Sequence, residues 1–290
     1  MNAPPIRVRL YGIRDPVLRQ FVKHIWIMNS NGTVLVDNRM LPVTNSDLVF
    51  SQRNSTTYVT EGASPVTVKA CHVLGIHDHP HKVQQFGSLS VLGVSFRPAG
   101  AFPFFGTPML EFRNRATDVD LIDKEFADRL QQGLSSMEST NDMLRLVEME
   151  LKRILDQRRI PEEPLHWVAG RLSDSSESTT VEVVCNECGV HVRTAERWFH
   201  KYIGVGPKQF QRISRFQQAS RDLLYNRPPS LTTVAHNWGF FDQSHFIREF
   251  TTFAGASPTT FLAAGDSMRA ALITDQQKAR GGRRPTVSEM

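Results

Sequence analysis

The C-terminal part of the sequence contains a unit that occurs twice, 51 residues apart. Four pairs of identical residues are related by this shift: Arg197 and Arg248, Phe199 and Phe250, Gly204 and Gly255, and Pro207 and Pro258. In each copy a short apolar segment leads into a glycine turn, CGV or WGF, and a second segment with helical spacing follows. Helix, short glycine turn and helix form the helix-turn-helix motif. The repeat therefore predicts two such units in one chain.

The segment between the two copies, residues 207–226, predicts a single long helix. Its apolar residues recur at helical spacing: Phe210, Ile213, Phe216, Ala219, and Leu223 or Leu224. Such a helix would hold the two units at a fixed separation. Adjacent major-groove faces of duplex DNA recur every ~34 Å, so two rigidly joined helices can each enter one groove.

The second copy, GFFDQSHFIREFTTFAGASP at 239–258, shows how such a helix divides its faces. Phe246 and Phe250 are four residues apart, and we expect them to pack inward. Polar residues occupy other positions near the start of the same helix: Gln243, Ser244, His245 and Arg248. These side chains can reach base edges and phosphates. Residues 190–269 also contain ten Lys and Arg against five Asp and Glu, which favours an anionic partner.

The N-terminal part reads differently. Residues 1 to about 115 have strand signals, with alternating runs such as IRVRL and an Asn31-Gly32 pair that predicts a hairpin turn. Later apolar runs separated by Gly, Pro, Asn and Ser suit a small barrel or sandwich. From about 117 to 157 the spacing becomes helical, with a stripe of Leu144, Val147, Leu151 and Ile154. We expect this stripe to pack on its own domain, while a dimer seam stays open.

These patterns predict an α+β chain with a β-rich domain before an all-α domain. The predicted divisions are a β-rich sensory or dimerisation domain with a helical connector at 1–157, a linker at 158–164, a double helix-turn-helix domain at 165–268, and a disordered tail at 269–290. Two prolines and mixed charge in RRIPEEP mark the linker.

Composition places the chain among cytoplasmic proteins. No apolar run approaches ~18 residues, so no membrane span is expected. The N-terminus MNAPPIRVRL lacks the apolar segment of a secretory signal, and the three cysteines are compatible with a reducing compartment. The sequence has no nucleophile elbow, P-loop or G-x-G-x-x-G motif, so we expect neither an enzyme nor a cofactor.

Two motifs resemble metal or redox sites. His77, His79 and His81 alternate in GIHDHPH and could bind zinc, iron or nickel, but Pro80 interrupts the strand that would align them. A solvated loop is the favoured interpretation, and no metal is expected. Cys185 and Cys188 have Cys-x-x-Cys spacing without a second pair. Buried thiols are favoured, and a redox switch stays open.

At the residues of the repeat, the chain resembles the AraC/XylS family of bacterial transcription regulators. LTTVAHNWGFFDQSHFIREFTTFAGASPTTF is similar almost position for position to the family's second helix-turn-helix and its G-x-S-P ending. The first unit departs at Ala195, where a larger apolar residue is usual, and at His191, where a small hydroxyl is usual. The resemblance covers roughly 162–264. It implies a set of DNA-facing residues: Arg193, Glu196, Arg197, Gln243, Ser244, His245 and Arg248.

The N-terminal segments LRQFVKHIWIMNS, LPVTNSDLVF and GVSFRPAGAFPFFGTPMLEFRNR are similar to the cupin-like sensory region that precedes such domains. The resemblance implies sensing of a small-molecule effector and names no ligand residue. Gln84 and Gln85 stand where the cupin metal motif has a glutamate.

The sequence thus predicts a DNA-binding transcription regulator that reads two adjacent major grooves of an operator. RNA polymerase and a second copy of the chain stay open as further partners. One alternative is a metal-dependent cupin-type enzyme or metal sensor joined to a DNA-binding anchor. Another is an architectural DNA binder without sequence preference.

Overall fold

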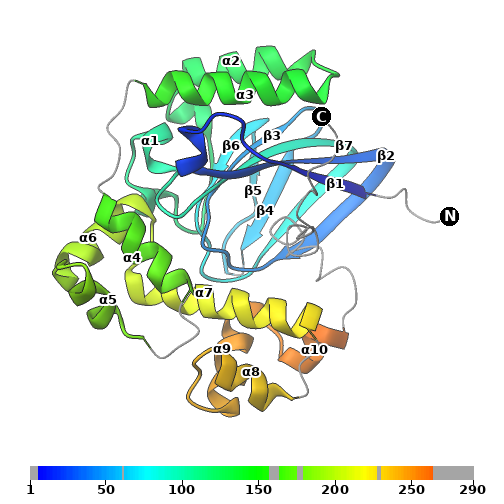
Figure 1. Ribbon diagram of the computed structural model, residues 1–290. Helices are drawn as coiled ribbons and strands as arrows, with labels where there is room; N and C mark the ends of the chain where they lie inside the picture. Colours follow the sequence, from blue (N-terminus) through cyan, green and yellow to red (C-terminus); the bar gives the residue numbers. More distant parts are fainter. Residues whose placement is uncertain (1–5, 61, 157–162, 175–178, 227–229, 264–290) are drawn as a thin grey trace, which may run out of the picture.

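The computed structural model describes residues 6–60, 62–156, 163–174, 179–226 and 230–263. The tail predicted at 269–290 lies outside these residues. The chain has a β-rich N-terminal part and a helical C-terminal part, as the sequence predicted. Helices α2 and α3 cover one side of the sheet, and the C-terminal helices lie on the opposite side (Figure 1).

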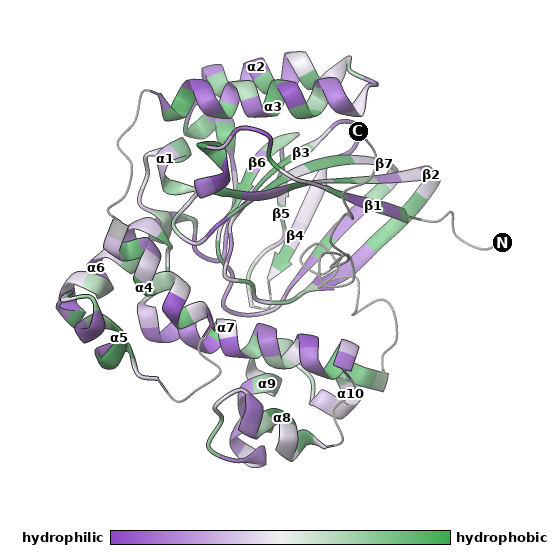
Figure 2. Cartoon of the chain, in the orientation of Figure 1, coloured by the Kyte–Doolittle hydropathy of each residue, from purple (hydrophilic) through white to green (hydrophobic). Residues whose placement is uncertain are grey.

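The strands of the N-terminal part form one antiparallel sheet. They are β1 (Ile6–Tyr11), β2 (Val22–Met40), β3 (Asp47–Ser51), β4 (Thr56–Thr60), β5 (Val66–Val68), β6 (Cys71–Leu74), β7 (His81–Phe96) and β8 (Ala116–Asp118). The main strand order is β1-β2-β7-β3-β6-β8, and β4 pairs with both β5 and β7. Polar and apolar residues alternate along β2 and β7, which is typical of strands with one buried face (Figure 2).

The predicted hairpin turn at Asn31-Gly32 is wrong. Both residues lie inside β2, where the register with β7 shifts between Asn29 and Thr33. The Ser30 hydroxyl bridges this irregularity, because it donates to the Gly32 carbonyl at 2.6 Å and accepts from the Leu89 N–H at 2.9 Å. A bulge and a tight turn favour the same residue types. Here both halves of β2 find their partner in the long strand β7, so the chain kinks instead of reversing.

Short helices follow the sheet before two longer ones. They are the 3-10 helices η1 (Leu18–Gln20), η2 (Met109–Phe112) and η3 (Val119–Leu121) and the α-helices α1 (Phe102–Phe105), α2 (Lys124–Ser135) and α3 (Thr140–Leu155). The stripe of α3 is buried in the core of its own domain: Leu144, Val147, Leu151 and Ile154. It packs with sheet residues such as Phe50 and Leu92, so the intradomain interpretation is confirmed and the stripe is not available as a dimer seam.

The C-terminal part is entirely helical within the described residues. Its elements are α4 (Glu163–Asp174), α5 (Val181–Glu187), α6 (Val192–Tyr202), α7 (Pro207–Arg221), the π-helical turn η4 (Asp222–Asn226), α8 (Leu231–Asn237), α9 (Gln243–Ala254) and α10 (Pro258–Ala263). Helix α7 and its π-helical extension cover the segment predicted as one long helix. Helix α4 begins at Glu163, inside the predicted linker, and residues 158–162 lie outside the described part.

The two parts of the chain share apolar packing. Leu41, Ile76 and Ala99 of the N-terminal part belong to the same buried cluster as the helix-turn-helix residues. The Phe102 and Tyr202 rings meet edge to face with centroids 4.7 Å apart. The N-terminal part therefore rests on the C-terminal end of α6, beside α7.

Among the described residues, no helix combines the length and the apolar content that a membrane crossing requires.

Candidate nucleic-acid interface

The first helices of the two units have matching starts and turns. Thr180 caps α5 by accepting the Val183 N–H, and Ser230 caps α8 by accepting the Thr233 N–H. Both helices end at a glycine with φ of 66°, in the left-handed region that glycine adopts without strain: Gly189 and Gly239. After each glycine a backbone N–H returns to the first helix at 2.9 Å, from Val190 to the Cys185 carbonyl and from Phe240 to the Ala235 carbonyl. These equivalent positions are 50 residues apart.

The second helices are related by a shift of 51 residues instead. His191 caps α6 through its ring Nδ1, which accepts the Arg193 N–H at 3.2 Å. Asp242 caps α9 through a carboxylate oxygen that accepts the His245 N–H at 2.6 Å. His191 therefore performs the capping role, although it is not the usual hydroxyl. The turn of the second unit contains one more residue, Phe241, between Phe240 and the cap.

An aromatic core fixes α9 to the connecting helix. Phe246 and Phe250 are 0% and 1% exposed, which confirms that they pack inward. The ring of Phe216 in α7 lies 5.2 Å from the rings of both Phe250 and Phe253, measured between centroids. Helix α7 runs from the first unit to the second (Figure 1). One buried side chain of the connecting helix thus orients the second unit.

The predicted DNA-facing residues lie on two exposed surfaces. Six of the seven side chains are exposed, and all belong to α6 or α9: Arg193, Glu196, Arg197, Gln243, Ser244 and Arg248. Among the residues that the structure describes, Arg193 forms no ion pair. The surfaces are amphipathic in the expected sense, since the residues on the other side of each helix pack into the core.

His245 differs from the other predicted residues because the turn already uses it. It is half-buried, and its Nδ1 accepts the Phe241 N–H at 3.2 Å. Its ring also meets the Phe240 ring edge to face at 5.6 Å. Gln243 is exposed, and its side-chain oxygen accepts the Thr232 hydroxyl at 2.8 Å. That bond orients the Gln243 amide and leaves its NH₂ group free of this contact.

Not every cation of this segment is available to DNA. Arg212 of α7 donates to both carboxylate oxygens of Glu249 in α9, at 2.7 and 2.9 Å. Burial opposes ionisation of Glu249, but the hydrogen bonds and charge of Arg212 outweigh it and hold the pKa of Glu249 below its ordinary value. Arg215 donates to the Gly239 carbonyl at 3.0 Å and lies over the Phe240 ring. The charge count treated both arginines as phosphate ligands, and the structure shows them as internal supports of the second unit.

The other cations divide in the same way. Arg193, Arg197, Lys208 and Arg248 are exposed on or beside the two units. Lys201 is exposed too, but its ammonium group lies over the Phe102 ring at 5.5 Å.

The histidine motif is not a solvated loop, which corrects that expectation. His77 and His81 are 3% and 4% exposed, and their rings lie 3.9 Å apart between centroids. Burial lowers the pKa of His77 to about 4 and that of His81 to about 2, so both are neutral near pH 7. His79 turns outward and contacts Asp78. No cluster of three or more His, Cys, Asp or Glu suited to a metal ion occurs in the described part of the chain.

The Cys-x-x-Cys pair contains two free thiols. Cys185 is fully buried, as expected, and Cys188 is half-buried with its thiol 3.4 Å from the Cys185 carbonyl. Cys188 is therefore more accessible than the sequence indicated.

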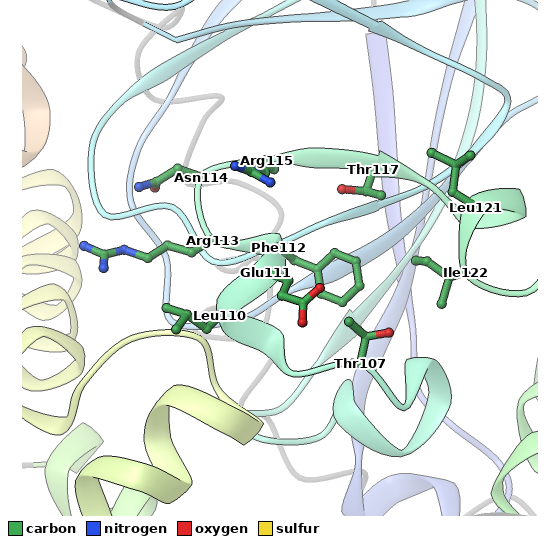
Figure 3. A pocket seen from close by; sticks show the side chains of 10 residues that line it. All are labelled: Thr107, Leu110, Glu111, Phe112, Arg113, Asn114, Arg115, Thr117, Leu121 and Ile122. Atoms are coloured by element: carbon green, nitrogen blue, oxygen red, sulfur yellow. The ribbon is translucent and has the colours of Figure 1, made fainter.

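An open groove of about 800 Å³ lies in the N-terminal part, between η2 and β8 (Figure 3). Its lining includes Leu110, Arg113, Asn114, Arg115 and Leu121. Arg113 and Asn114 already bond to the Asp78 carboxylate. The groove has apolar and cationic walls, and nothing in it selects one ligand.

Comparison with known proteins gives the family. A model of a helix-turn-helix domain of the AraC type matches residues 184–264, which include both units. The chain belongs to the AraC family of transcription regulators. A second model, a domain of unknown function (DUF6597), matches residues 15–118. The two matches follow the change from the β-rich part to the helical part.

One curated relative is the probable thc operon regulatory protein of Rhodococcus erythropolis, which is 33% identical over 90 residues. The alignment covers 30% of this chain and 27% of that relative. Among solved structures, apo ToxT from Vibrio cholerae is 12% identical with a TM-score of 0.44, covering 90% of this chain and 98% of that one. A fatty-acid-bound ToxT structure from the same organism is 12% identical, with a TM-score of 0.42 and coverages of 81% and 96%. We draw no conclusion about fold or ligand from either structure, since both TM-scores lie below 0.5.

Proposed function

We propose that this member of the AraC family is a sequence-specific regulator of transcription that reads two adjacent major grooves, α6 in one and α9 in the next. One observation carries the proposal: a single helix, α7, joins two helix-turn-helix units whose second helices each present exposed polar and cationic side chains. Rigid joining lets one chain place both helices one turn of DNA apart. Binding to chromosomal DNA would place this activity in the cytoplasm, and it requires no catalytic step.

We assign different roles to residues by their position along α6 and α9. A recognition helix meets base edges with its N-terminal residues. Arg193 and Gln243 lie in the first turns of their helices, so they would pair with bases, while Arg197 and Arg248 lie one turn further and would hold phosphates. Glu196, Ser244 and His245 complete the two proposed surfaces, with His245 limited to its Nε2 edge because Nδ1 is used in the turn.

Replacing Arg193 or Gln243 with alanine is expected to weaken binding to the preferred site by roughly 1–3 kcal/mol, because a bidentate pair with guanine or adenine is lost. Each change should also relax preference at one base pair. The measurement is selection of bound duplexes from a random pool, carried out in parallel for the original protein and both variants.

Lys208→Ala is the matched control, since Lys208 precedes neither recognition helix and should weaken all sequences alike. A sequence logo unchanged by both alanine variants, in proteins that still fold, would remove these two residues from base reading. A pool that is bound without enrichment would favour the architectural alternative, because a specific regulator prefers its site by ~10³-fold or more.

We also propose that the helical part, from α4 onward, binds DNA by itself. Its support is the buried cluster in which Leu165, Val168 and Leu172 of α4 pack with α5–α10. A fragment of residues 158–290 is therefore expected to fold and to shift a selected duplex at low salt. Circular dichroism supplies the folding control. A folded fragment without DNA binding would contradict this division of the chain.

The N-terminal part is proposed to sense a small-molecule effector. The support is the separate family match at 15–118 and the packing of this part on α6. A homodimer and a contact with RNA polymerase are proposed partners of the same regulator. The metal-dependent enzyme has no comparable support, since the buried His77–His81 pair lacks a third ligand among the described residues.

A further inference from the structure

Phe241 is the most exposed large apolar side chain in the described residues. It is 92% exposed, and the next, Leu121, is 76% exposed. Exposed apolar residues scattered singly are ordinary on protein surfaces, so exposure alone decides nothing. The position of Phe241 is what separates it from the others. It is the one residue by which the second helix-turn-helix turn exceeds the first, directly before the cap of α9.

The turn presents this ring on a fixed backbone. The N–H of Phe241 itself donates to His245 Nδ1 at 3.2 Å. On one side the neighbouring Phe240 is 8% exposed and packs against Phe246 with ring centroids 5.1 Å apart. On the other side Asp242 caps α9. The backbone at Phe241 is therefore held from both directions, while its side chain contacts solvent.

The neighbours of Phe241 are the residues that we assign to DNA. Asp242, Gln243 and Ser244 follow it directly and are all exposed. A ring at this place cannot satisfy a phosphate, which needs a hydrogen-bond donor or a cation. The major groove offers one prominent apolar group, the C5-methyl of thymine, and phenylalanine is a side chain that contacts it. Apolar wedges between base steps belong to minor-groove binders, whereas α9 would enter the major groove.

We propose that the Phe241 ring packs against the C5-methyl group of a thymine in the half-site read by α9, and so specifies thymine at that position. The inference rests on the proposed function, because it requires α9 to lie in a major groove. It adds to that function a base contact made by the turn, beside those made by the helix.

The test uses the full-length protein and the duplex selected from a random pool. Each thymine of the half-site for α9 is replaced in turn by deoxyuridine, which removes only the methyl group. The original protein is expected to lose about fourfold in affinity at one of these positions, the effect of burying one methyl group. Phe241→Ser should weaken binding to the thymine duplex and should show no further loss at that position.

Two more variants separate this contact from other causes. Phe241→Leu keeps an apolar side chain and is expected to retain part of the methyl preference. Phe86→Ser removes a phenylalanine that is 69% exposed on β7, and it should bind both duplexes like the original protein.

A half-site for α9 without thymine would overturn the inference, as would an unchanged affinity at every deoxyuridine substitution. An equal methyl effect in Phe241→Ser would overturn it as well. In these cases the selected duplex is still bound, so the proposed function stands. Failure of the original protein to select any duplex would instead overturn both.

Discussion

Replacing Phe216 with alanine is expected to destabilise the C-terminal part by about 3–5 kcal/mol, the usual cost of deleting a buried aromatic ring and leaving a cavity. Phe216 is 1% exposed and contacts the rings of Phe250 and Phe253. Because these contacts join the connecting helix to α9, we expect DNA binding to fall with stability. Chemical denaturation followed by circular dichroism measures the change.

Phe241→Ala is the matched control for Phe216→Ala, since it removes the same ring from an exposed position of the same region. Its free energy of unfolding should change by no more than about 0.5 kcal/mol. If the two variants are equally stable, the aromatic contact does not hold the second unit.

Raising the salt concentration from 50 to 200 mM is expected to weaken DNA binding on the order of 100-fold. Four exposed cations, Arg193, Arg197, Lys208 and Arg248, can each displace about one counterion. With a slope of about −0.9 per phosphate, they give a slope of log K against log salt near −3.6. Arg227 and Arg269 lie outside the described residues and would steepen it.

Lys208→Ala should make this slope shallower by about 1. Fluorescence anisotropy at five or more salt concentrations gives both values. A flat dependence for the original protein would mean that its ligand is not a polyanion of this kind. A slope near −1 would mean that most of these side chains point away from the phosphates.

The helical part could be predicted from the sequence because its signals are local. The capping residues Thr180 and Ser230, the turn glycines Gly189 and Gly239, and the aromatic spacing each act within one or two turns of chain. The assignment of inner and outer faces followed from the same spacing. What the spacing could not show was the difference between the shifts of 50 and 51, because the repeat was aligned on the second helices alone.

Errors arose where a distant partner decides the outcome. Asn31-Gly32 favours a turn locally, but strand β7, some 55 residues later, pairs with both sides of it. A charge count could not separate Arg212 and Arg215 from the free cations, since their partners Glu249 and Gly239 are supplied by the second unit. His77 and His81 became buried because the sheet closes around them, and Pro80 gives no sign of that.

The two helix-turn-helix units follow one another along a single chain and differ in turn length and in the residues they expose. A two-fold axis would require identical surfaces, and palindromic operators reflect such an axis in dimeric proteins. One copy of this chain has none. A DNA site that it reads on the proposed function would therefore have a polarity, with a first and a second half that cannot be exchanged, and inverting the site would reverse the direction in which the sheet-bearing half of the protein faces along the DNA.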